Sequence, residues 1–387
     1  MKEDQNDLPC CVHYASSYLP LTENWIYRIL IHQKKYKPVF LSRKKENLSL
    51  FPFPALYSLD DYSTARQLLE ILAFKILGYF IFFKKICKQS NAQILHMHFG
   101  YHGVKMIGLK KTLGVPMICS FYGDDAFSHP LIGNMMKKYK LLFNAADKIL
   151  VLGPYMRAQL ISLGCDESKV SIHHLGIDID KIPFKKRSLK SIAPIKFLIA
   201  SSFVEKKGID LAIRALSKFR NRHSFSLDIV GDGPLKSDLL LLVEQCGIRD
   251  RVHWHGYKPY QYFIDLAYDC DVFIQASRTT DGNRKEGTPM AIVDAMATGM
   301  TIISTKHSDI PEIVTDGLHG YLAEENNLAS LEDCILKIFD NPTVIEFFSQ
   351  NSRNKIEKEF NVQHQVIKLE ALYTELIQSY STNRSAK

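Results

Sequence analysis

The fold can be inferred from the stretch 286-EGTPMAIVDAMATGMTIIS-304, which contains the signals of a loop, a helix and a buried strand in that order. Thr288 can cap a helix that begins at Pro289, and Gly299 suits the residue just past the end of that helix. The β-branched run 301–304 predicts a short buried strand. A unit of loop, helix and strand is typical of a doubly wound α/β sheet.

Two acidic residues lie close to the start of this helix. Glu286 stands in the loop before it, and Asp294 stands inside it. A helix N-terminus presents unpaired N–H groups and a partial positive charge, which suits a phosphate. A diphosphate resting there would leave each carboxylate able to accept hydrogen bonds from hydroxyl groups on one side of it. The alternative is an ordinary capped helix with one acidic residue outside it and one on a solvated face, and spacing alone favours that alternative.

Length and composition indicate a globular protein of two domains. The chain has 387 residues, of which 46% are apolar and 23% charged. No run of eighteen apolar residues appears, and the N-terminus MKEDQNDLPCC lacks a signal-peptide core, so we expect a cytoplasmic protein. Eight cysteines without a CxxC motif argue against a disulfide framework and against a structural zinc site.

The positive charge is concentrated in the first half of the chain. Residues 1–190 hold 27 Lys and Arg against 15 Asp and Glu, whereas the remainder holds 22 against 26. Such a field attracts nucleic acid or an anionic membrane surface. The lysines are scattered and no nucleic-acid-binding motif is present, so we expect no nucleic acid. The segment 68-LLEILAFKILGYFIFFKKICK-88 is interrupted by Glu70 and Lys75 and cannot easily span a bilayer. It is either a buried helix or a helix seated at an anionic membrane surface.

Apolar strand-like runs alternate with helical patterns along most of the chain, which favours parallel sheets built from βαβ units. The expected strands are 37–42, 94–99, 115–121, 148–152, 196–201, 226–230, 271–275 and 301–304. The stretch 176–194 breaks this rhythm with prolines and basic residues. We therefore expect one Rossmann-like domain over 1–180, a linker over 181–194, a second such domain over 195–360, and a helix and tail over 361–387.

Two turns of the second domain are candidates for ligand contact. In 201-SSFVEKKG-208, Lys207 follows Glu205 in a loop expected at the carboxyl end of a strand, where open α/β sheets bind ligands. Lys207 is thus a candidate phosphate clamp, although such turns are usually just solvated. Gly231 and Gly233 would let the backbone approach a ligand, but the GDG motif alone is a weak signal.

The histidines of 96-HMHFGYH-102 raise the question of a metal. His96 and His98 would share one face of a strand, as metal ligands can. We favour histidines at the end of a buried strand near a cleft, and we expect no metal site.

In their order along the chain, several of these stretches resemble the nucleotide-sugar domain of the family-four retaining glycosyltransferases of the GT-B fold. They are SSFVEKKG, VGDGP, RVHWHGY, EGTPMAIVDAMATG and PEIVTDGLHGYL. The resemblance is closest to the branch acting in exopolysaccharide and lipopolysaccharide assembly, including the colanic-acid type. That branch is indicated by 18-YLPLTENWIYR-28, 96-HMHFG-100, 120-SFYGDD-125 and 174-HLGIDIDKIPF-184. The resemblance spans about residues 15 to 360 and implies an acceptor-binding domain and a nucleotide-sugar domain facing across a cleft.

The resemblance also implies roles for the residues of the opening stretch. Glu286 stands where the family has a glutamate that contacts the donor sugar, and Asp294 stands where it has a second glutamate, which contacts the nucleotide ribose. Aspartate keeps the carboxylate but is one methylene shorter. The residues implied at the donor diphosphate are Lys207, Gly287, Thr288, Pro289 and Met290. An arginine that many members carry nearby is replaced by Ser202.

In the first domain, Tyr122 takes the place of a histidine that many members carry near the reacting centre. With an unperturbed pKa of about 10, tyrosine positions groups through a hydrogen bond rather than through a charge. Asp125 matches an aspartate from which we expect orientation of the acceptor or of the loop, and His98 is a further polar contact. The loop 22–24 is our guess for an acceptor-facing segment, and backbone over 255–257 is a candidate for contact with the base.

The implied reaction moves a sugar from a nucleoside-diphosphate sugar to a hydroxyl of a saccharide, with retention of anomeric configuration. We expect a UDP sugar as donor, a lipid-linked acceptor, no cofactor and no metal. The enzyme would work in the cytoplasm, peripherally on the inner face of the cell membrane. Two alternatives stay open, namely a nucleotide-sugar epimerase and a non-catalytic subunit that binds a sugar nucleotide or a glycan.

Overall fold

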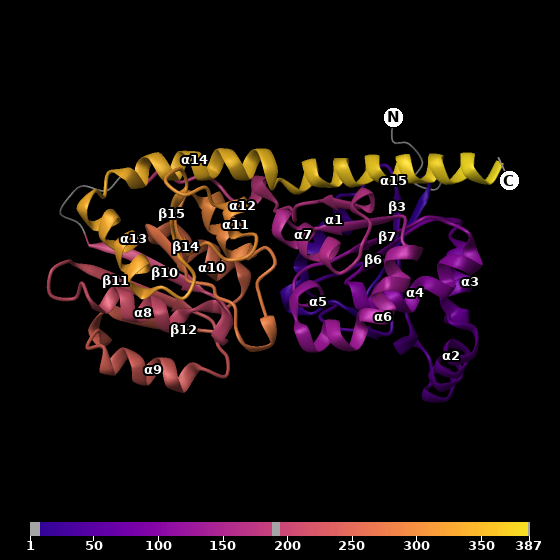
Figure 1. Ribbon diagram of the computed structural model, residues 1–387, viewed down its shortest axis with the longest axis horizontal. Helices are drawn as coiled ribbons and strands as arrows, with labels where there is room; N and C mark the ends of the chain where they lie inside the picture. Colours follow the sequence, from indigo (N-terminus) through magenta and orange to yellow (C-terminus); the bar gives the residue numbers. More distant parts are fainter. Residues whose placement is uncertain (1–7, 188–193, 386–387) are drawn as a thin grey trace. The chain divides into compact units, whose positions relative to one another are not determined.

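The computed structural model describes residues 8–187 and 194–385, and the chain divides into two compact units. Unit 1 comprises the chain up to Gly176 together with the segment from Val362 onward, and unit 2 comprises Ile177–Asn361. Each unit is built around a parallel β-sheet with helices packed against it (Figure 1). The expectation of an α/β protein with two Rossmann-like domains is confirmed.

The sheet of unit 1 has the order β5-β3-β1-β6-β7-β8-β9. Its strands are β1 Cys10–Tyr14, β3 Lys37–Ser42, β5 Leu56–Ser58, β6 Ala92–His98, β7 Met117–Ser120, β8 Lys148–Val151 and β9 Val170–Ile172. A separate two-stranded sheet pairs β2 Ser17–Tyr18 with β4 Lys44–Lys45. The strand order reverses between β1 and β6, so the loops that follow these strands meet where doubly wound sheets bind ligands.

The helices of unit 1 connect these strands, and the C-terminal helix returns to pack on them. They are α1 Asn24–His32, α2 Thr64–Leu77, α3 Ile81–Gln89, α4 Gly100–Leu113, α5 Asp124–Phe127, α6 His129–Ala145, α7 Pro154–Ser162 and α15 Val362–Ser385. Leu369 and Tyr373 of α15 join a buried cluster with Cys11 of β1 and Ile94 of β6. Helix α15 lies within the segment 361–387, for which a helix and tail were expected, and it closes one face of unit 1.

The sheet of unit 2 has the order β12-β11-β10-β13-β14-β15. Its strands are β10 Ile195–Ala200, β11 Phe225–Val230, β12 Val252–Gly256, β13 Val272–Gln275, β14 Thr301–Thr305 and β15 Gly320–Ala323. Its helices are α8 Ile209–Ser217, α9 Lys236–Gln245, α10 Tyr260–Asp269, α11 Met290–Thr298, α12 Ile310–Ile313, α13 Leu328–Asp340 and α14 Val344–Glu359. Here the strand order reverses between β10 and β13.

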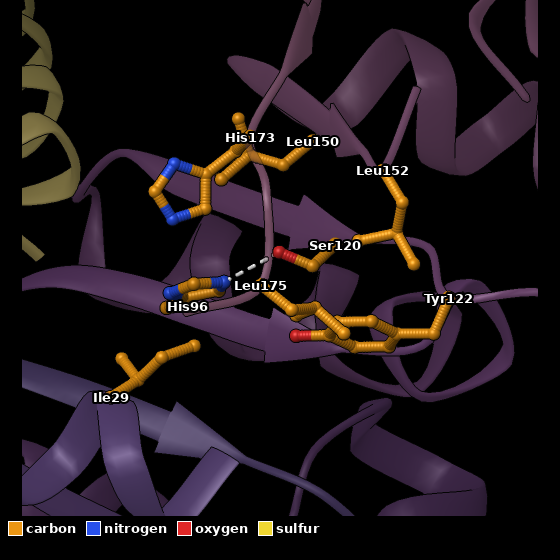
Figure 2. Close-up of a pocket in the computed structure, with 8 residues that line it drawn as sticks. All are labelled: Ile29, His96, Ser120, Tyr122, Leu150, Leu152, His173 and Leu175. Atoms are coloured by element: carbon orange, nitrogen blue, oxygen red, sulfur yellow. Dashed lines mark hydrogen bonds between the residues drawn. The ribbon is translucent and has the colours of Figure 1, made fainter. Parts of the chain in front are cut away.

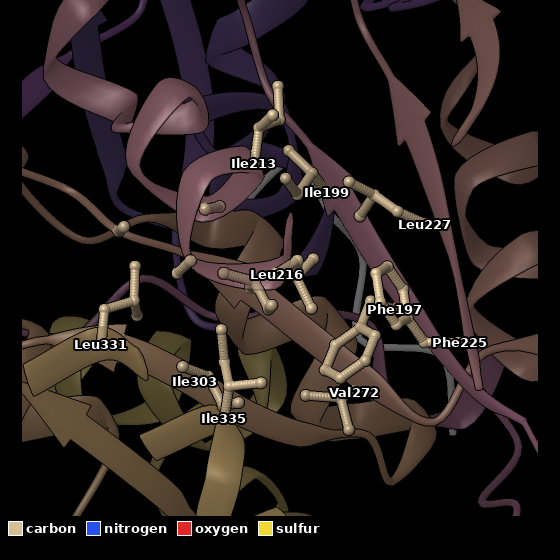
Figure 3. Close-up of a cluster of buried hydrophobic side chains, with 14 of the residues drawn as sticks. Phe197, Ile199, Ile213, Leu216, Phe225, Leu227, Val272, Ile303, Leu331 and Ile335 are labelled. Carbon is tan, nitrogen blue, oxygen red and sulfur yellow. The ribbon is translucent and has the colours of Figure 1, made fainter. Parts of the chain in front are cut away.

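Alternate residues of β10 pack on opposite faces of this sheet, as the period of a strand requires. Phe197 and Ile199 belong to the cluster formed with α8 and α13, which Figure 3 shows. Leu198 and Ala200 belong to the cluster formed with α10 and α11. Because both faces are covered, residues 197–200 of the strand form a continuous apolar run, which is why it was recognisable in the sequence.

Three expectations differ from the structure in detail. The helix of the opening stretch begins at Met290, and Pro289 rather than Thr288 holds the N-cap position, without a side-chain cap. The segment 68–88 is not one buried helix but two helices, α2 and α3, separated at Gly78, whose left-handed conformation ends α2.

The third difference concerns the interdomain boundary. Residues 177–187 pack as part of unit 2, because Ile177, Ile179 and Ile182 are buried in its core. The Arg187 guanidinium donates to the carbonyl oxygens of Ala267, Cys270 and Thr298. The remaining part of the expected linker, 188–193, lies outside the described residues.

No helix in the described part of the chain is both long and apolar enough to cross a membrane. The eight cysteines are free thiols, and all but Cys246 are buried. The buried ones act as small core residues.

Candidate active site

A buried ion pair joins the loops that follow β10 and β13 in unit 2. The Nζ of Lys207 lies 2.9 Å from Oε2 of Glu286, and the Nζ of Lys206 lies 3.9 Å from Oε1. Both loops leave the carboxyl ends of neighbouring strands at the point where the strand order reverses. The two residues expected at the donor's phosphate and sugar therefore stand side by side.

The Glu286 carboxylate is buried beside two lysines, and only one of its two oxygens has a hydrogen-bond partner among the described residues. Its side chain is only 6% exposed, and within the described residues Oε1 accepts no hydrogen bond. Burial alone would raise the pKa of this carboxyl, but Lys207 and Lys206 outweigh burial and hold the pKa below its usual value. Glu286 is thus a buried anion with one oxygen able to accept a hydrogen bond from a ligand.

Two residues that were not predicted from the sequence, His307 and Glu325, hold the backbone of Glu286 in place. The backbone N–H of Glu286 donates to Nε2 of His307 at 3.0 Å, and Nδ1 of His307 lies 2.8 Å from Glu325. Because Nε2 accepts, the proton of the neutral ring stands on Nδ1 and is donated to Glu325. Burial lowers the pKa of His307 although Glu325 opposes the shift. No motif in the sequence indicates this arrangement, since it depends on β14 lying beside β13.

The first turn of α11 follows Glu286 directly, so its unpaired N–H groups lie on the same edge of the sheet. Gly287, Thr288 and Met290 are partly exposed there, and Pro289 is buried and offers no N–H group. Further along the helix, Asp294 is 4% exposed and accepts a hydrogen bond from the Tyr260 hydroxyl at 2.8 Å. The alternative of an aspartate on a solvated face is therefore wrong.

The glycines near this site serve the packing of its loops. Gly208 has a φ of +62°, and a Cβ there would stand 1.8 Å from the carbonyl oxygen of Ala276. This close approach brings the Lys207 turn against the segment after β13. Gly231 and Gly233 approach the backbone of Ser201 and Phe203 in the same way, so their freedom is used between loops.

Glu205, the remaining candidate in the donor loop, is exposed and lies 3.8 Å from the Arg278 guanidinium. Arg278 also pairs with Asp210 at 3.0 Å, and its backbone N–H donates to the Lys206 carbonyl. This pairing fixes the loop after β13 to the loop after β10.

In unit 1, the loop after β7 carries Tyr122, and Asp125 lies in the short helix α5 that follows this loop. Oδ1 of Asp125 accepts hydrogen bonds from the N–H groups of Tyr122 and Gly123, and Oδ2 accepts one from Gly100. Burial raises the pKa of Asp125 to about 6, although these N–H groups oppose the shift. The carboxylate therefore ties the start of α4, which follows β6, to the loop after β7.

The Tyr122 hydroxyl lies 2.7 Å from Nδ1 of His98 at the end of β6. Nε2 of His98 lies 3.1 Å from Nδ1 of His13 on β1, and Nε2 of His13 lies 2.9 Å from the Gln33 amide. Burial raises the pKa of Tyr122 and lowers the pKa of His13 to about 3, so these groups are neutral. Tyr122 is thus one end of a chain of hydrogen bonds that passes through the buried rings of His98 and His13 and ends at Gln33.

His96 stands beside this chain in a small pocket of unit 1, where it hydrogen-bonds Ser120 at 2.7 Å (Figure 2). Its Nδ1 lies 2.5 Å from the Tyr373 hydroxyl of α15. Ring nitrogens of His13, His96 and His98 lie within 4.8 Å of one another, a spacing that metal ligands also have. Each ring nitrogen of the three has a hydrogen-bonding partner in the described residues, so the cluster is a hydrogen-bonded network.

Three further side chains surround Tyr122. The rings of Trp25 and Phe99 have centroids 5.6 Å and 4.9 Å from that of Tyr122. Phe99 has a φ of 69°, an unusual conformation for a residue with a side chain. Glu23, from the loop guessed to face an acceptor, has a pKa raised to about 7 by burial and by the charges of Glu46 and Asp125. The sequence does not show that the Asp125 charge acts on Glu23, since the two residues are 102 positions apart in the chain.

Two family models match the chain, described as Glycosyl transferases group 1 over residues 180–358 and as Glycosyltransferase Family 4 over residues 65–181. The chain is also 32% identical over 290 residues to the putative colanic acid biosynthesis glycosyltransferase WcaL of Salmonella typhimurium, covering 72% of this chain and 70% of that protein. The chain belongs to glycosyltransferase family 4. It is therefore a glycosyltransferase of polysaccharide biosynthesis, as the sequence resemblance implied.

A second relative and a solved structure extend this comparison. The glycosyltransferase is 24% identical over 312 residues, 76% of its length, to the UDP-Gal:alpha-D-GlcNAc-diphosphoundecaprenol alpha-1,3-galactosyltransferase of Escherichia coli, of which it covers 78%. The crystal structure of Anabaena HepE in complex with UDP matches with a TM-score of 0.77 and 14% identity, over 95% of this chain and all of that one. The fold of the glycosyltransferase is therefore GT-B.

Proposed function

We propose that this glycosyltransferase moves a sugar from a UDP sugar to a hydroxyl group of a lipid-linked saccharide, with retention of anomeric configuration. The observation that carries the proposal is the pair formed by Lys207 and Glu286, with one Glu286 oxygen accepting no hydrogen bond in the described residues. The UDP bound by the HepE protein supports the choice of nucleotide. The diphosphoundecaprenol-linked substrate in the name of the Escherichia coli relative supports the choice of acceptor.

In this proposal Lys207 and the first turn of α11 hold the diphosphate of the donor. A lysine and the positive end of a helix dipole both stabilise the negative charge that develops on a departing phosphate. The Lys207 ammonium then contacts both the phosphate and the Glu286 carboxylate. Glu286 accepts hydrogen bonds from hydroxyl groups of the donor sugar through the oxygen described above.

The nucleoside lies on the other side of the same turn. Asp294 accepts hydrogen bonds from the ribose hydroxyls. Its Oδ1 is held in place by the hydrogen bond that the Tyr260 hydroxyl donates at 2.8 Å. Backbone groups over 255–257 contact the base. Aspartate is short, so the fixed orientation that Tyr260 provides compensates for the missing methylene.

The reaction then exchanges one bond at the anomeric carbon for another on the same face of the sugar. The bond to the diphosphate oxygen breaks, the bond to the acceptor oxygen forms, and the acceptor proton passes to the phosphate oxygen that has left. The products are UDP and the extended saccharide. Glu286 and Asp294 bind the donor, so neither acts as a covalent nucleophile. The reaction uses no metal or cofactor.

Calorimetric binding of UDP, GDP, ADP and CMP to the purified protein tests this proposal. We expect UDP to bind and Lys207→Ala to weaken that binding at least tenfold, about 1.4 kcal/mol. Lys337→Ala is the matched control, because Lys337 is exposed and pairs with Asp333 within α13. Glu286→Gln should weaken binding of UDP sugars more than binding of UDP.

The outcomes separate the proposal from its alternatives. Binding of none of the four nucleotides would contradict it. Binding of a UDP sugar without transfer to any saccharide acceptor would support a non-catalytic subunit. Formation of an isomeric UDP sugar from the donor alone would support an epimerase.

A further inference from the structure

The loop after β14 places a buried histidine at the edge of the sheet that carries the candidate active site. The strand leads directly into the turn 307–310, which is closed by a hydrogen bond of 3.0 Å from the N–H of Ile310 to the carbonyl oxygen of His307. Ser308 in this turn has a φ of 49°, a left-handed conformation that is uncommon for a residue with a side chain. Because β14 lies beside β13 in the parallel sheet, the buried ring of His307 stands at the same edge as Glu286.

The two neighbours of the His307 ring fix where its proton stands. A backbone N–H can only donate, so Nε2, which lies 3.0 Å from the backbone nitrogen of Glu286, is an unprotonated acceptor. Nδ1 lies 2.8 Å from Oε2 of Glu325, whose Oε1 accepts the backbone N–H of Thr279 at 2.6 Å. Only the neutral ring with its proton on Nδ1 satisfies both neighbours. A charged ring would set its Nε2–H against the N–H of Glu286.

Glu286 is therefore anchored on two sides. Its backbone is held by His307 and its Oε2 by the ammonium of Lys207 at 2.9 Å, whereas Oε1 accepts no hydrogen bond among the described residues. A side chain that binds a ligand through one oxygen has to be held within about 0.5 Å of its working position. Loss of the backbone anchor would consequently act on the oxygen that is left for the ligand.

A second histidine of unit 2 shows what a purely structural role looks like. His319 is 4% exposed, and its Nδ1 accepts the backbone N–H of Thr315 at 2.9 Å. It stands directly before β15, at the amino edge of the parallel sheet, whereas His307 follows β14 at the carboxyl edge. Both are buried histidines that accept a backbone N–H, but of these two only His307 holds a residue of the candidate active site.

We propose that the neutral ring of His307, held in one tautomer by Glu325, positions Glu286 for hydrogen bonds with the hydroxyl groups of the donor sugar. His307 is thus a positioning residue for the sugar, whereas Lys207 and Asp294 hold the diphosphate and the ribose. This inference rests on the proposed function, because it takes Glu286 as the residue that binds the sugar.

Sugar binding should then be sensitive to acid. The charged groups around the ring are Glu325, after β15, and Glu286 and Lys285, before α11. Burial lowers the pKa of His307 below its usual value of about 6.5, although the two carboxylates oppose this shift. Above that value the ring is neutral and accepts the Glu286 N–H. As the pH falls through the pKa of His307, the added proton removes this acceptor and releases the backbone of Glu286.

Calorimetry of the full chain with UDP-glucose and with UDP tests this role. His307→Leu removes the acceptor and leaves an apolar side chain in its place, and it should weaken binding of UDP-glucose about tenfold or more. It should change the affinity for UDP by about twofold or less. His307→Gln supplies an oxygen near the place of Nε2 that accepts the same N–H, and it should restore UDP-glucose binding to within about threefold of the unchanged protein.

The pH dependence gives a second readout. Below about pH 6.5 the affinity of the unchanged protein for UDP-glucose should fall, and that of His307→Gln should not, because glutamine gains no proton in this range. The ionisation of the other donor-site residues is common to both proteins and cancels in the comparison. Far-UV circular dichroism sets the lowest pH at which both proteins are folded.

His319→Leu is the matched control. It also removes a buried acceptor of a backbone N–H, so it should lower the urea midpoint of unit 2 and leave UDP-glucose binding unchanged. Equal weakening by His307→Leu and His319→Leu would overturn the positioning role. The same pH profile for the unchanged protein and His307→Gln would overturn it as well.

Ring-nitrogen NMR shifts separate failure of this inference from failure of the proposed function. Comparison with His307→Gln assigns the His307 signals, and we expect a proton on Nδ1 and none on Nε2 at neutral pH. A proton on Nε2 would contradict the inference whatever the ligand. Binding of UDP without binding of UDP-glucose by the unchanged protein would count against the sugar role of Glu286. Absence of UDP binding, with the expected tautomer present, would count against the proposed function instead.

Discussion

Mild acid should unfold unit 1 well before unit 2, because unit 1 buries a set of neutral histidines. Burial lowers the pKa of each of them, to about 3 for His13 and His102, to about 4 for His173, and well below the usual value for His96 and His98. A group whose pKa is lowered by folding adds stability above its unfolded pKa, and this contribution is lost as the pH falls. The loss therefore begins near pH 6.5, the usual pKa of histidine.

The size of the effect follows from proton linkage. Between about pH 7 and about pH 5, each of these five histidines costs about 2 kcal/mol of unfolding free energy, because its pKa in the folded protein lies below this range. Two carboxyls act in the opposite direction, since folding raises the pKa of Asp125 to about 6 and of Glu23 to about 7. They return about 3 kcal/mol on acidification, which leaves a net loss of about 7 kcal/mol. That is comparable with the whole stability of a domain.

The two tryptophans allow each unit to be followed separately. Trp25 lies in unit 1 and Trp254 in unit 2, so Trp254→Phe leaves a fluorescence signal from unit 1 and Trp25→Phe leaves one from unit 2. Urea unfolding of both variants at about pH 7 and about pH 5 gives the two free energies of unfolding. Unit 2 should lose less, because among the histidines of its described residues only His307 and His319 have a lowered pKa.

Equal losses in the two variants would refute this reasoning. So would a unit 1 transition that is the same at both pH values, since it would mean that the buried histidines do not resist protonation. Circular dichroism of both variants at neutral pH is the control for an effect of the tryptophan substitutions themselves.

Three other substitutions have definite expected outcomes. Tyr122→Phe should lower the unfolding free energy of unit 1 by about 1 to 2 kcal/mol, because a buried histidine loses its partner, and should leave UDP binding unchanged, as calorimetry would check. Asp294→Ala should weaken UDP binding at least tenfold, whereas Tyr260→Phe should weaken it about threefold or less; similar losses would argue against ribose contact. Gly208→Ala should lower the urea midpoint of unit 2 far more than Gly256→Ala, since both have positive φ but only the first would place its Cβ against a backbone oxygen.

The sequence predicted those parts of the fold that depend on local pattern. The strands buried on both faces, such as 196–201, are apolar runs bounded by turns, and they were found. Strand β1, Cys10–Tyr14, was missed although it lies near the centre of its sheet, because its five residues include a histidine and two cysteines. A run that short does not distinguish a strand from a loop.

The site shows the same division between local and distant information. Lys207 and Glu286 could be paired in advance, because each follows a strand and the carboxyl ends of parallel strands share an edge. The positions of His13 and His307 could not be predicted in this way. Each lies on or just after a neighbouring strand, and no local motif indicates the order of the strands in the sheet. Glu70 shows a third limit. It is an acidic residue of α2 that is only 7% exposed, and a pattern of charges does not tell which side of a helix faces inward.

The path of the chain between the units affects how the protein is made. Unit 2 is inserted between Gly176 and Val362 of unit 1, so the ribosome completes unit 2 before it releases the last helix of unit 1. Until then Lys34 and Lys35 lack the Glu370 carboxylate that accepts their N–H groups at 2.7 Å, and His96 lacks the Tyr373 hydroxyl. The nascent N-terminal part of unit 1 therefore exposes an apolar face, and its polar core is complete only when α15 has emerged.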